Sequence, residues 1–134
     1  MPTRPPIAVA ISFVDAINRC DLAALGALMT EDHVLVVFDE PALSGRAANV
    51  DAWKGYMAAY PSYVIHPHAL AVSDARVAIV GTTTGSHLGL PDETAMQQSL
   101  IWLADIAGSK VAAWRLIPDT PEHRRGFGLP PLAR

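Results

Sequence analysis

The feature that most constrains this sequence is a change in the spacing of its apolar residues near Pro61. Before that proline, apolar side chains recur every three or four residues, which is the spacing of an amphipathic helix. After it, the chain consists of apolar, β-branched runs typical of strands, separated by short turn signals. Connections this short join antiparallel neighbours. The sequence therefore predicts an α+β fold, with helices packed on one face of an antiparallel sheet.

Four elements are expected before Pro61, in the order helix, helix, strand, helix. Their approximate bounds are residues 6–20, 22–29, 33–38 and 50–59. Asp21 is typical of an N-cap for the second helix, and Asn49 or Asp51 of one for the third. One face of the third helix carries Trp53, Tyr56, Met57 and Tyr60.

Four strands are expected after Pro61, over residues 63–72, 76–87, 95–105 and 110–117. Together they predict a four-stranded antiparallel meander. The segment after Pro118 is rich in proline, and we expect it to be irregular and to wrap the sheet or a partner. We take residues 1–134 as one domain, with a core over about 7–118 and a tail over 119–134.

Composition and charge exclude several classes of protein. A hydrophobic content of 51% is too high for a disordered chain. A net charge of −3 argues against nucleic acid or a membrane surface as a partner. The single cysteine, Cys20, allows no internal disulfide. The apolar runs are too short to span a bilayer, so a cytoplasmic location is expected.

Several local phrases, in this order of elements, carry a resemblance to a known family. They are residues 13–22 (FVDAINRCDL), 28–32 (LMTED), 44–47 (SGRA) with Trp53, and 108–115 (GSKVAAWR). The chain resembles the SnoaL-like branch of the nuclear-transport-factor-2-like superfamily, which has a cystatin-like fold. The resemblance implies a cone-shaped, curved antiparallel sheet with three N-terminal helices packed on it, enclosing an apolar pocket. The superfamily includes ketosteroid isomerases, polyketide cyclases, a dehydratase and an epoxide hydrolase, so the fold alone gives no activity.

Strand alternation within the implied cone sorts side chains into an inward and an outward set. The residues expected to form the ligand-binding pocket are Phe13, Trp53, Tyr56, Met57, Ile79, Thr83, Gln98, Leu100, Trp102 and Trp114. This set is apolar and aromatic, which suits a small apolar molecule held by one or two hydrogen bonds. We expect neither a cofactor nor a metal ion.

Ketosteroid-isomerase chemistry needs a carboxylate base and two acids that stabilise an enolate oxygen. The positions that the resemblance assigns to the two acids are Phe13 and Leu100 here, so both donors are missing. Asp39 is the nearest match to the base and is retained as a catalytic candidate. The alternative for Asp39 is a turn residue that accepts backbone hydrogen bonds.

His87 is the leading catalytic candidate. Strand alternation places it on the inner face beside Gln98 and Thr83. An imidazole can accept or donate a proton near neutral pH, so we expect His87 to act as a general base. The alternative is a histidine at the rim of the pocket, in contact with water.

The remaining histidines favour structural interpretations. His66 and His68 have a spacing that could bind zinc if a third ligand converged, but they are expected to face away from the pocket. Pro67 between them favours an edge strand or a bulge. For His33 we expect a surface position or a hydrogen-bonded place in the core.

Two functional hypotheses follow. The first is a cofactor-independent enzyme that isomerises, cyclises or dehydrates an apolar carbonyl substrate by acid–base chemistry. The second is a non-catalytic ligand-binding or dimerisation module with the same fold. A homodimer through the convex sheet face is expected, because an apolar patch there would otherwise contact water. The outward residues concerned are Val80, Thr82, Ser99, Ile101 and Leu103.

Overall fold

The computed structural model describes residues 4–131 of the chain. Its elements, in chain order, are α1 (Pro6–Asn18), α2 (Leu22–Ala27), β1 (Met29–Val37), β2 (Leu43–Ser44), α3 (Arg46–Ala59), β3 (Val64–Ser73), β4 (Arg76–Thr84), α4 (Asp92–Ala95), β5 (Leu100–Ala107), β6 (Lys110–Pro118) and α5 (Pro121–Gly126). The predicted α+β class is confirmed. No helix in the described part of the chain has the length and apolar character needed to cross a membrane.

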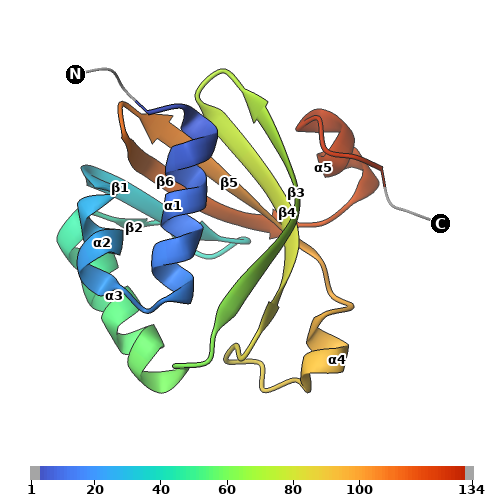
Figure 1. Ribbon diagram of the computed structural model, residues 1–134, viewed down its shortest axis with the longest axis horizontal. Helices are drawn as coiled ribbons and strands as arrows, with labels where there is room; N and C mark the ends of the chain where they lie inside the picture. The colour runs from blue at the N-terminus through green and yellow to red at the C-terminus, as the bar shows by residue number, and fades with distance from the viewer. Residues whose placement is uncertain (1–3, 132–134) are drawn as a thin grey trace.

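One six-stranded sheet organises the molecule, with the strand order β2-β1-β6-β5-β4-β3. Strands β3 to β6 form the predicted antiparallel meander. Strand β1 runs parallel to β6, and the two-residue β2 pairs with the outer edge of β1. The sheet is curved, and helices α1, α2 and α3 lie on the same side of it (Figure 1). This arrangement is the cone-shaped architecture that the resemblance implied.

The first strand begins earlier than the sequence predicted. Helix α2 ends at Ala27, and β1 starts at Met29 rather than at His33. Met29 is fully buried and pairs with Val111 on β6, while the carbonyl oxygen of Leu28 accepts a 2.6 Å hydrogen bond from the Val111 N–H. These parallel contacts with β6 end the helix before residue 29, and only the tertiary structure provides them.

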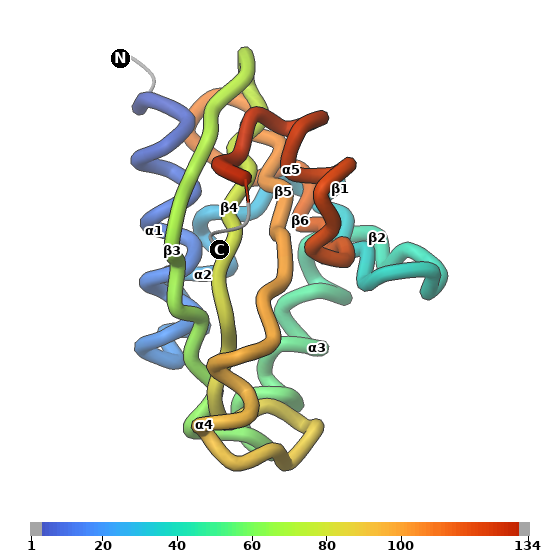
Figure 2. Tube along the Cα trace, turned by 90° about the vertical axis from the view of Figure 1, so that its right-hand side faces the viewer, coloured from blue at the N-terminus to red at the C-terminus, as the bar shows by residue number. Residues whose placement is uncertain are grey.

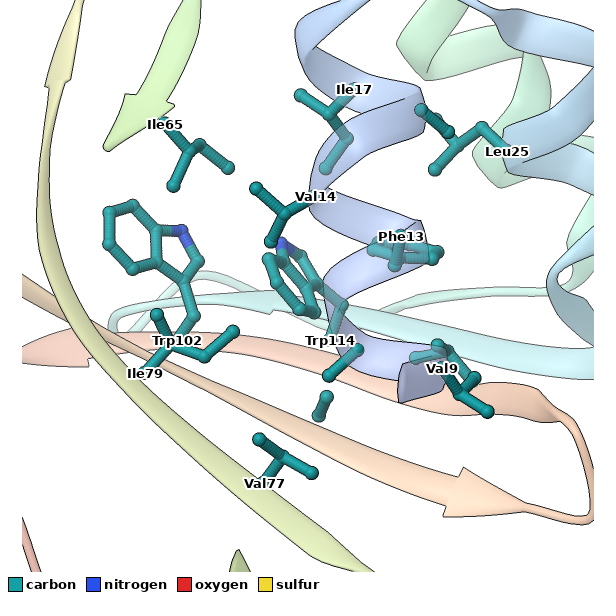
Figure 3. Close-up of a cluster of buried hydrophobic side chains, with 14 of the residues drawn as sticks. Val9, Phe13, Val14, Ile17, Leu25, Ile65, Val77, Ile79, Trp102 and Trp114 are labelled. Atoms are coloured by element: carbon teal, nitrogen blue, oxygen red, sulfur yellow. The ribbon is translucent and has the colours of Figure 1, made fainter. Parts of the chain in front are cut away.

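The inner face of the sheet packs against α1. Phe13 is fully buried, and its ring lies 4.8 Å from that of Trp114, centroid to centroid. Figure 3 shows the indole ring of Trp114 beside Val14 and Phe13 on the helix, and that of Trp102 extending from the sheet toward Ile65. Because both tryptophans, on adjacent strands, point inward, the strand alternation predicted for β5 and β6 is confirmed at these positions.

The C-terminal segment, residues 119–131, lies on the other face of the sheet. Figures 1 and 2 show α5 and α1 on opposite sides of strands β3 to β5. The prediction of an irregular tail is wrong over Pro121–Gly126, where α5 forms. The Thr120 hydroxyl accepts a 3.0 Å hydrogen bond from the His123 N–H, and Pro121 occupies the first turn. A capping side chain followed by proline begins a short helix here.

An ion pair within this segment fixes its conformation, and Ser99 ties it to the residue before β5. The carboxylate of Asp119 accepts hydrogen bonds from Nε and Nη2 of Arg124, each 2.6 Å long, and another from the Ser99 hydroxyl. The side chains of Asp119 and Arg124 are only 3% and 11% exposed. A bidentate pair of this kind is among the stronger charged contacts in proteins.

The apolar residues of the outer face are therefore covered within a single chain. Leu129, which is 5% exposed, packs on a cluster made of Ala78, Val80, Ile101 and Leu103. The expected homodimer rested on this patch contacting water in a monomer. That premise is wrong, because the C-terminal segment buries the patch. Association of two copies through this face stays a prediction.

Candidate functional site

A cavity of about 200 Å³ lies between α3 and the inner face of the sheet. Its lining residues are Leu35, Val37, Ala52, Trp53, Tyr56, Tyr63, His87, Trp102, Trp114 and Leu116. They come from β1, α3, β5 and β6, and from the segments just before β3 and just after β4. All three tryptophans of the chain belong to this lining. Most of the wall surface is apolar, which is typical of a pocket for a small organic molecule.

Helix α3 is fixed in place by a buried amide. The helix begins at Arg46, so Asn49 is not the predicted N-cap and lies inside the first turns. Its side-chain Nδ2 lies within hydrogen-bond distance of the carbonyl oxygens of His33 (3.2 Å), Leu43 (3.0 Å) and Gly45 (2.8 Å). These contacts tie α3 to β1 and β2. The helix is thereby placed so that Ala52, Trp53 and Tyr56 line the cavity.

Two polar side chains of the lining, Tyr56 and His87, meet where α3 approaches the loop after β4. The Tyr56 hydroxyl lies 3.0 Å from Nδ1 of His87, and the backbone N–H of His87 donates a 3.1 Å hydrogen bond to the same hydroxyl oxygen. Strand β4 ends at Thr84, and Gly85 has a φ of 71°. Only glycine adopts this conformation without strain, so the chain turns out of the strand before His87.

An aromatic cluster surrounds this pair. Tyr56 packs edge to face against Tyr63 and Trp53, at centroid distances of 5.1 and 6.1 Å, and Tyr60 lies 6.1 Å from the His87 ring. Burial raises the pKa of Tyr56, and the backbone N–H of His87 opposes this effect. Burial also raises the pKa of Tyr63 strongly, with a further increase from Tyr56 beside it. Both phenols therefore keep their protons and remain neutral donors.

Five of the residues predicted for the site line the cavity. They are Trp53, Tyr56, His87, Trp102 and Trp114. Six others lie outside the lining, namely Phe13, Met57, Ile79, Thr83, Gln98 and Leu100. Phe13 and Ile79 are fully buried in the core, Thr83 is buried on β4, and Met57 and Leu100 pack against the core from its edge.

The predicted grouping of His87 with Gln98 and Thr83 does not form. Gln98 is exposed, because α4 and the residues after it occupy the place where the strand was predicted, and β5 begins only at Leu100. His87 was predicted to end the strand over 76–87, but β4 ends at Thr84 and His87 lies beyond it. Tyr56 takes the position beside His87 that was predicted for Gln98.

Asp39 lies apart from the cavity. It is exposed in the turn that follows β1. A 2.9 Å hydrogen bond from the Glu40 N–H to the Val37 carbonyl oxygen closes this turn. Among residues 4–131, the cavity lining includes no aspartate or glutamate. The geometry therefore provides no carboxylate base at this site.

His66 and His68 lie away from the cavity. Nε2 of His66 contacts the Thr84 hydroxyl at 2.9 Å, and Nε2 of His68 contacts the Thr82 hydroxyl at 3.3 Å. The predicted edge strand and bulge are confirmed, because β3 is an edge strand and its register shifts just after Pro67. Within residues 4–131, no three histidine, cysteine or acidic side chains are grouped so that they could hold a metal ion.

His33 occupies the core, as one of the two interpretations of the sequence expected. It is fully buried, and its Nδ1 donates a 2.6 Å hydrogen bond to the carbonyl oxygen of Val111. Burial lowers the pKa of His33, although this hydrogen bond and nearby Asp32 oppose the effect. His33 is therefore held neutral in the folded protein.

Several lining residues were missed by the sequence interpretation, namely Leu35, Val37, Ala52 and Tyr63. Leu35 and Val37 alternate along β1, so strand alternation could have found these two. Tyr63 precedes β3 and carries no such signal.

Comparison with known proteins identifies relatives of this fold. The model of the SnoaL-like domain family matches residues 10–114. A cystatin-fold protein from Novosphingobium aromaticivorans superposes with a TM-score of 0.71 at 14% identity, covering 85% of this chain and 98% of that chain. A candidate polyketide cyclase from Sinorhizobium meliloti superposes with a TM-score of 0.67 at 23% identity, covering 81% of this chain and 93% of that chain. A candidate ketosteroid isomerase from Kribbella flavida superposes with a TM-score of 0.67 at 17% identity, covering 98% of this chain and 86% of that chain. No curated protein matches the chain. At these identities the solved structures show the fold alone.

Proposed function

The chain belongs to the SnoaL-like domain family, and from that premise we propose that its cavity binds a small, largely apolar molecule that carries one carbonyl oxygen. The observation that carries this proposal is the lining: aromatic and aliphatic walls with one polar pair, Tyr56 and His87, at one side. Apolar walls supply affinity through burial, while a single polar group fixes the orientation of the ligand.

Tryptophan fluorescence can test this binding, because all three tryptophans of the chain line the cavity. Titration with small ketones such as cyclohexanone and acetophenone should change the emission and saturate. Ala52 lines the cavity from α3, so Ala52→Phe should fill it and abolish the saturable change. Ala58→Phe is a matched control, since Ala58 is an exposed residue of the same helix outside the lining. Equal titration curves for the two variants would contradict binding in this cavity.

The second candidate function is acid–base catalysis on the bound carbonyl compound. The observation that favours it is that His87, whose imidazole can accept or donate a proton, both lines the cavity and contacts the Tyr56 hydroxyl. Isomerisation, cyclisation and dehydration beside a carbonyl share one step, the removal of a proton from the adjacent carbon. Because the described lining includes no carboxylate, His87 is the candidate to assist this step, either by accepting the proton or by donating a hydrogen bond to the carbonyl oxygen.

Hydrogen–deuterium exchange tests this step without knowledge of the substrate. Small ketones in D₂O would exchange the protons beside the carbonyl faster with the enzyme than without it. His87→Gln should remove most of the acceleration, typically about 10²- to 10⁴-fold for a general acid or base. His66→Gln, which changes a histidine on the other side of the sheet, should retain it. If ketones bind but their exchange is not accelerated, the catalytic function is contradicted and binding remains the proposed function.

A further inference from the structure

The hydrogen bonds around Tyr56 determine which nitrogen of His87 carries the proton. A phenol has one hydrogen to donate, and its oxygen accepts hydrogen bonds as well. The Tyr56 oxygen already accepts the backbone N–H of His87 at 3.1 Å. Among the described residues, Nδ1 of His87, at 3.0 Å, is the acceptor placed to receive the Tyr56 hydrogen.

The opposite assignment leaves a donor unused. If Nδ1 carried the proton, both the ring N–H and the backbone N–H of His87 would point at the Tyr56 oxygen. The Tyr56 hydrogen would then have no acceptor within the described chain. His87 is exposed, so in this second assignment the Tyr56 hydrogen would be left to water. The first assignment is favoured because it uses both the oxygen and the hydrogen of the Tyr56 hydroxyl in contacts within the chain. The raised pKa of Tyr56 agrees with a phenol that keeps and donates its hydrogen.

We propose that Tyr56 holds His87 in the tautomer protonated at Nε2, so that the cavity presents a hydrogen-bond donor to its ligand. In a neutral imidazole, a nitrogen that accepts a hydrogen bond leaves the proton on the other nitrogen. Since Nδ1 is engaged by Tyr56, Nε2 is the ring nitrogen that remains for the ligand. His87 then donates to the ligand oxygen and does not remove a proton from its carbon, which replaces the general-base role expected from the sequence. Tyr56 is a positioning residue in this arrangement.

The size of the cavity narrows the ligand class further. A buried apolar cavity of about 150 Å³ holds one benzene molecule. The cavity beside Tyr56 and His87 measures about 200 Å³. It therefore has room for a single ring with a short substituent. Together with the donor at Nε2, this indicates a one-ring compound with an acceptor oxygen, such as a cyclic or aryl ketone. This ligand class rests on the proposed binding function.

The tautomer can be measured without any ligand. Long-range ¹H–¹⁵N correlation spectra distinguish the two ring nitrogens, and the signals of His87 are assigned by their loss in His87→Gln. We expect the wild-type protein to show the Nε2-protonated form, and Tyr56→Phe to show a mixture of both forms. Tyr60→Phe is a matched control, since the Tyr60 ring also contacts His87 but forms no hydrogen bond with it in the described structure. A wild-type spectrum dominated by the Nδ1-protonated form, or one unchanged in Tyr56→Phe, would overturn the proposal.

Ligand affinity then tests the consequence for selectivity. Cyclohexanone and methylenecyclohexane have nearly the same shape, but only the ketone accepts a hydrogen bond. Tyr56→Phe should weaken cyclohexanone binding by about two- to tenfold, the value of one hydrogen bond, and leave methylenecyclohexane binding unchanged. Equal losses for both compounds would contradict the donor role. If neither compound binds the wild-type protein, the proposed binding function fails, while the spectra still decide the tautomer.

Discussion

Gly81 on β4 provides a test of how closely β3 and β4 approach each other. A Cβ atom added at Gly81 would lie 2.2 Å from the carbonyl oxygen of His66 and 3.0 Å from Cα of Pro67. Ordinary contacts begin near 3.4 Å, so the strands would have to separate by about 1 Å. Both obstructing groups are backbone atoms, and no side-chain rotation relieves the clash. Because β3 is an edge strand, it can move outward without disturbing a further strand.

We expect Gly81→Ala to lower the free energy of unfolding by about 2–3 kcal/mol, the usual cost of overpacking. At about 3.5 °C per kcal/mol for a domain of this length, the melting temperature should fall by about 7–11 °C. Thermal unfolding followed by circular dichroism measures this change.

Gly55→Ala is the matched control, because Gly55 lies inside α3 with open space around its Cα. Removing the backbone freedom of a helical glycine should raise the stability by about 0.5–1 kcal/mol, or about 2–4 °C. A Gly81→Ala variant that melts within about 2 °C of the wild-type protein would refute the close approach of the two strands.

Three further predictions concern the core and the outer face. Trp102 is 1% exposed and also lines the cavity, so Trp102→Ala should lower the free energy of unfolding by about 3–5 kcal/mol and abolish ketone binding; melting and titration measure both. Leu129→Ala should cost about 2–3 kcal/mol and expose the outer apolar cluster, so sedimentation should detect more self-association than in the wild-type chain. The pKa of His33 lies below its ordinary value of 6.5 in the folded state, so the unfolded chain takes up its proton first as the pH falls. Above about pH 6.5, His33 should therefore contribute a constant amount to the free energy of unfolding. Between that pH and the folded-state pKa, the free energy of unfolding should fall by at most about 1.4 kcal/mol per pH unit, which chemical denaturation measures. His33→Asn should lack this contribution, and an equal slope in both proteins would contradict it.

The inward and outward faces of the strands were predictable because they depend only on local alternation. Trp102 and Trp114 point inward, while Ile101 and Leu103 point outward, as a period of two requires. Errors arose where a strand ended. Gly85 marks the end of β4 and could have been taken as a stop before His87, since glycine readily adopts positive φ.

Gln98 was predicted to lie on a strand because the residues after it are strand-like. Pro91 and the two acidic residues after it begin α4 instead, and this local signal was given too little weight in the sequence prediction.

Other features depend on contacts between distant parts of the chain. The depth at which Phe13 lies could not be predicted, because helical spacing defines a face and not what covers it. Coverage of the outer face by Leu129 depends on the buried pair of Asp119 and Arg124, which no periodic pattern indicates.

The central claim is that the cavity binds a one-ring carbonyl compound with its oxygen at His87. A crystal structure of the protein soaked with cyclohexanone tests it most directly. We predict density for one ring among Trp53, Trp102 and Trp114, with the carbonyl oxygen about 2.7–3.2 Å from Nε2 of His87. An empty cavity at saturating ketone, or a bound ring whose oxygen points away from His87, would contradict the claim.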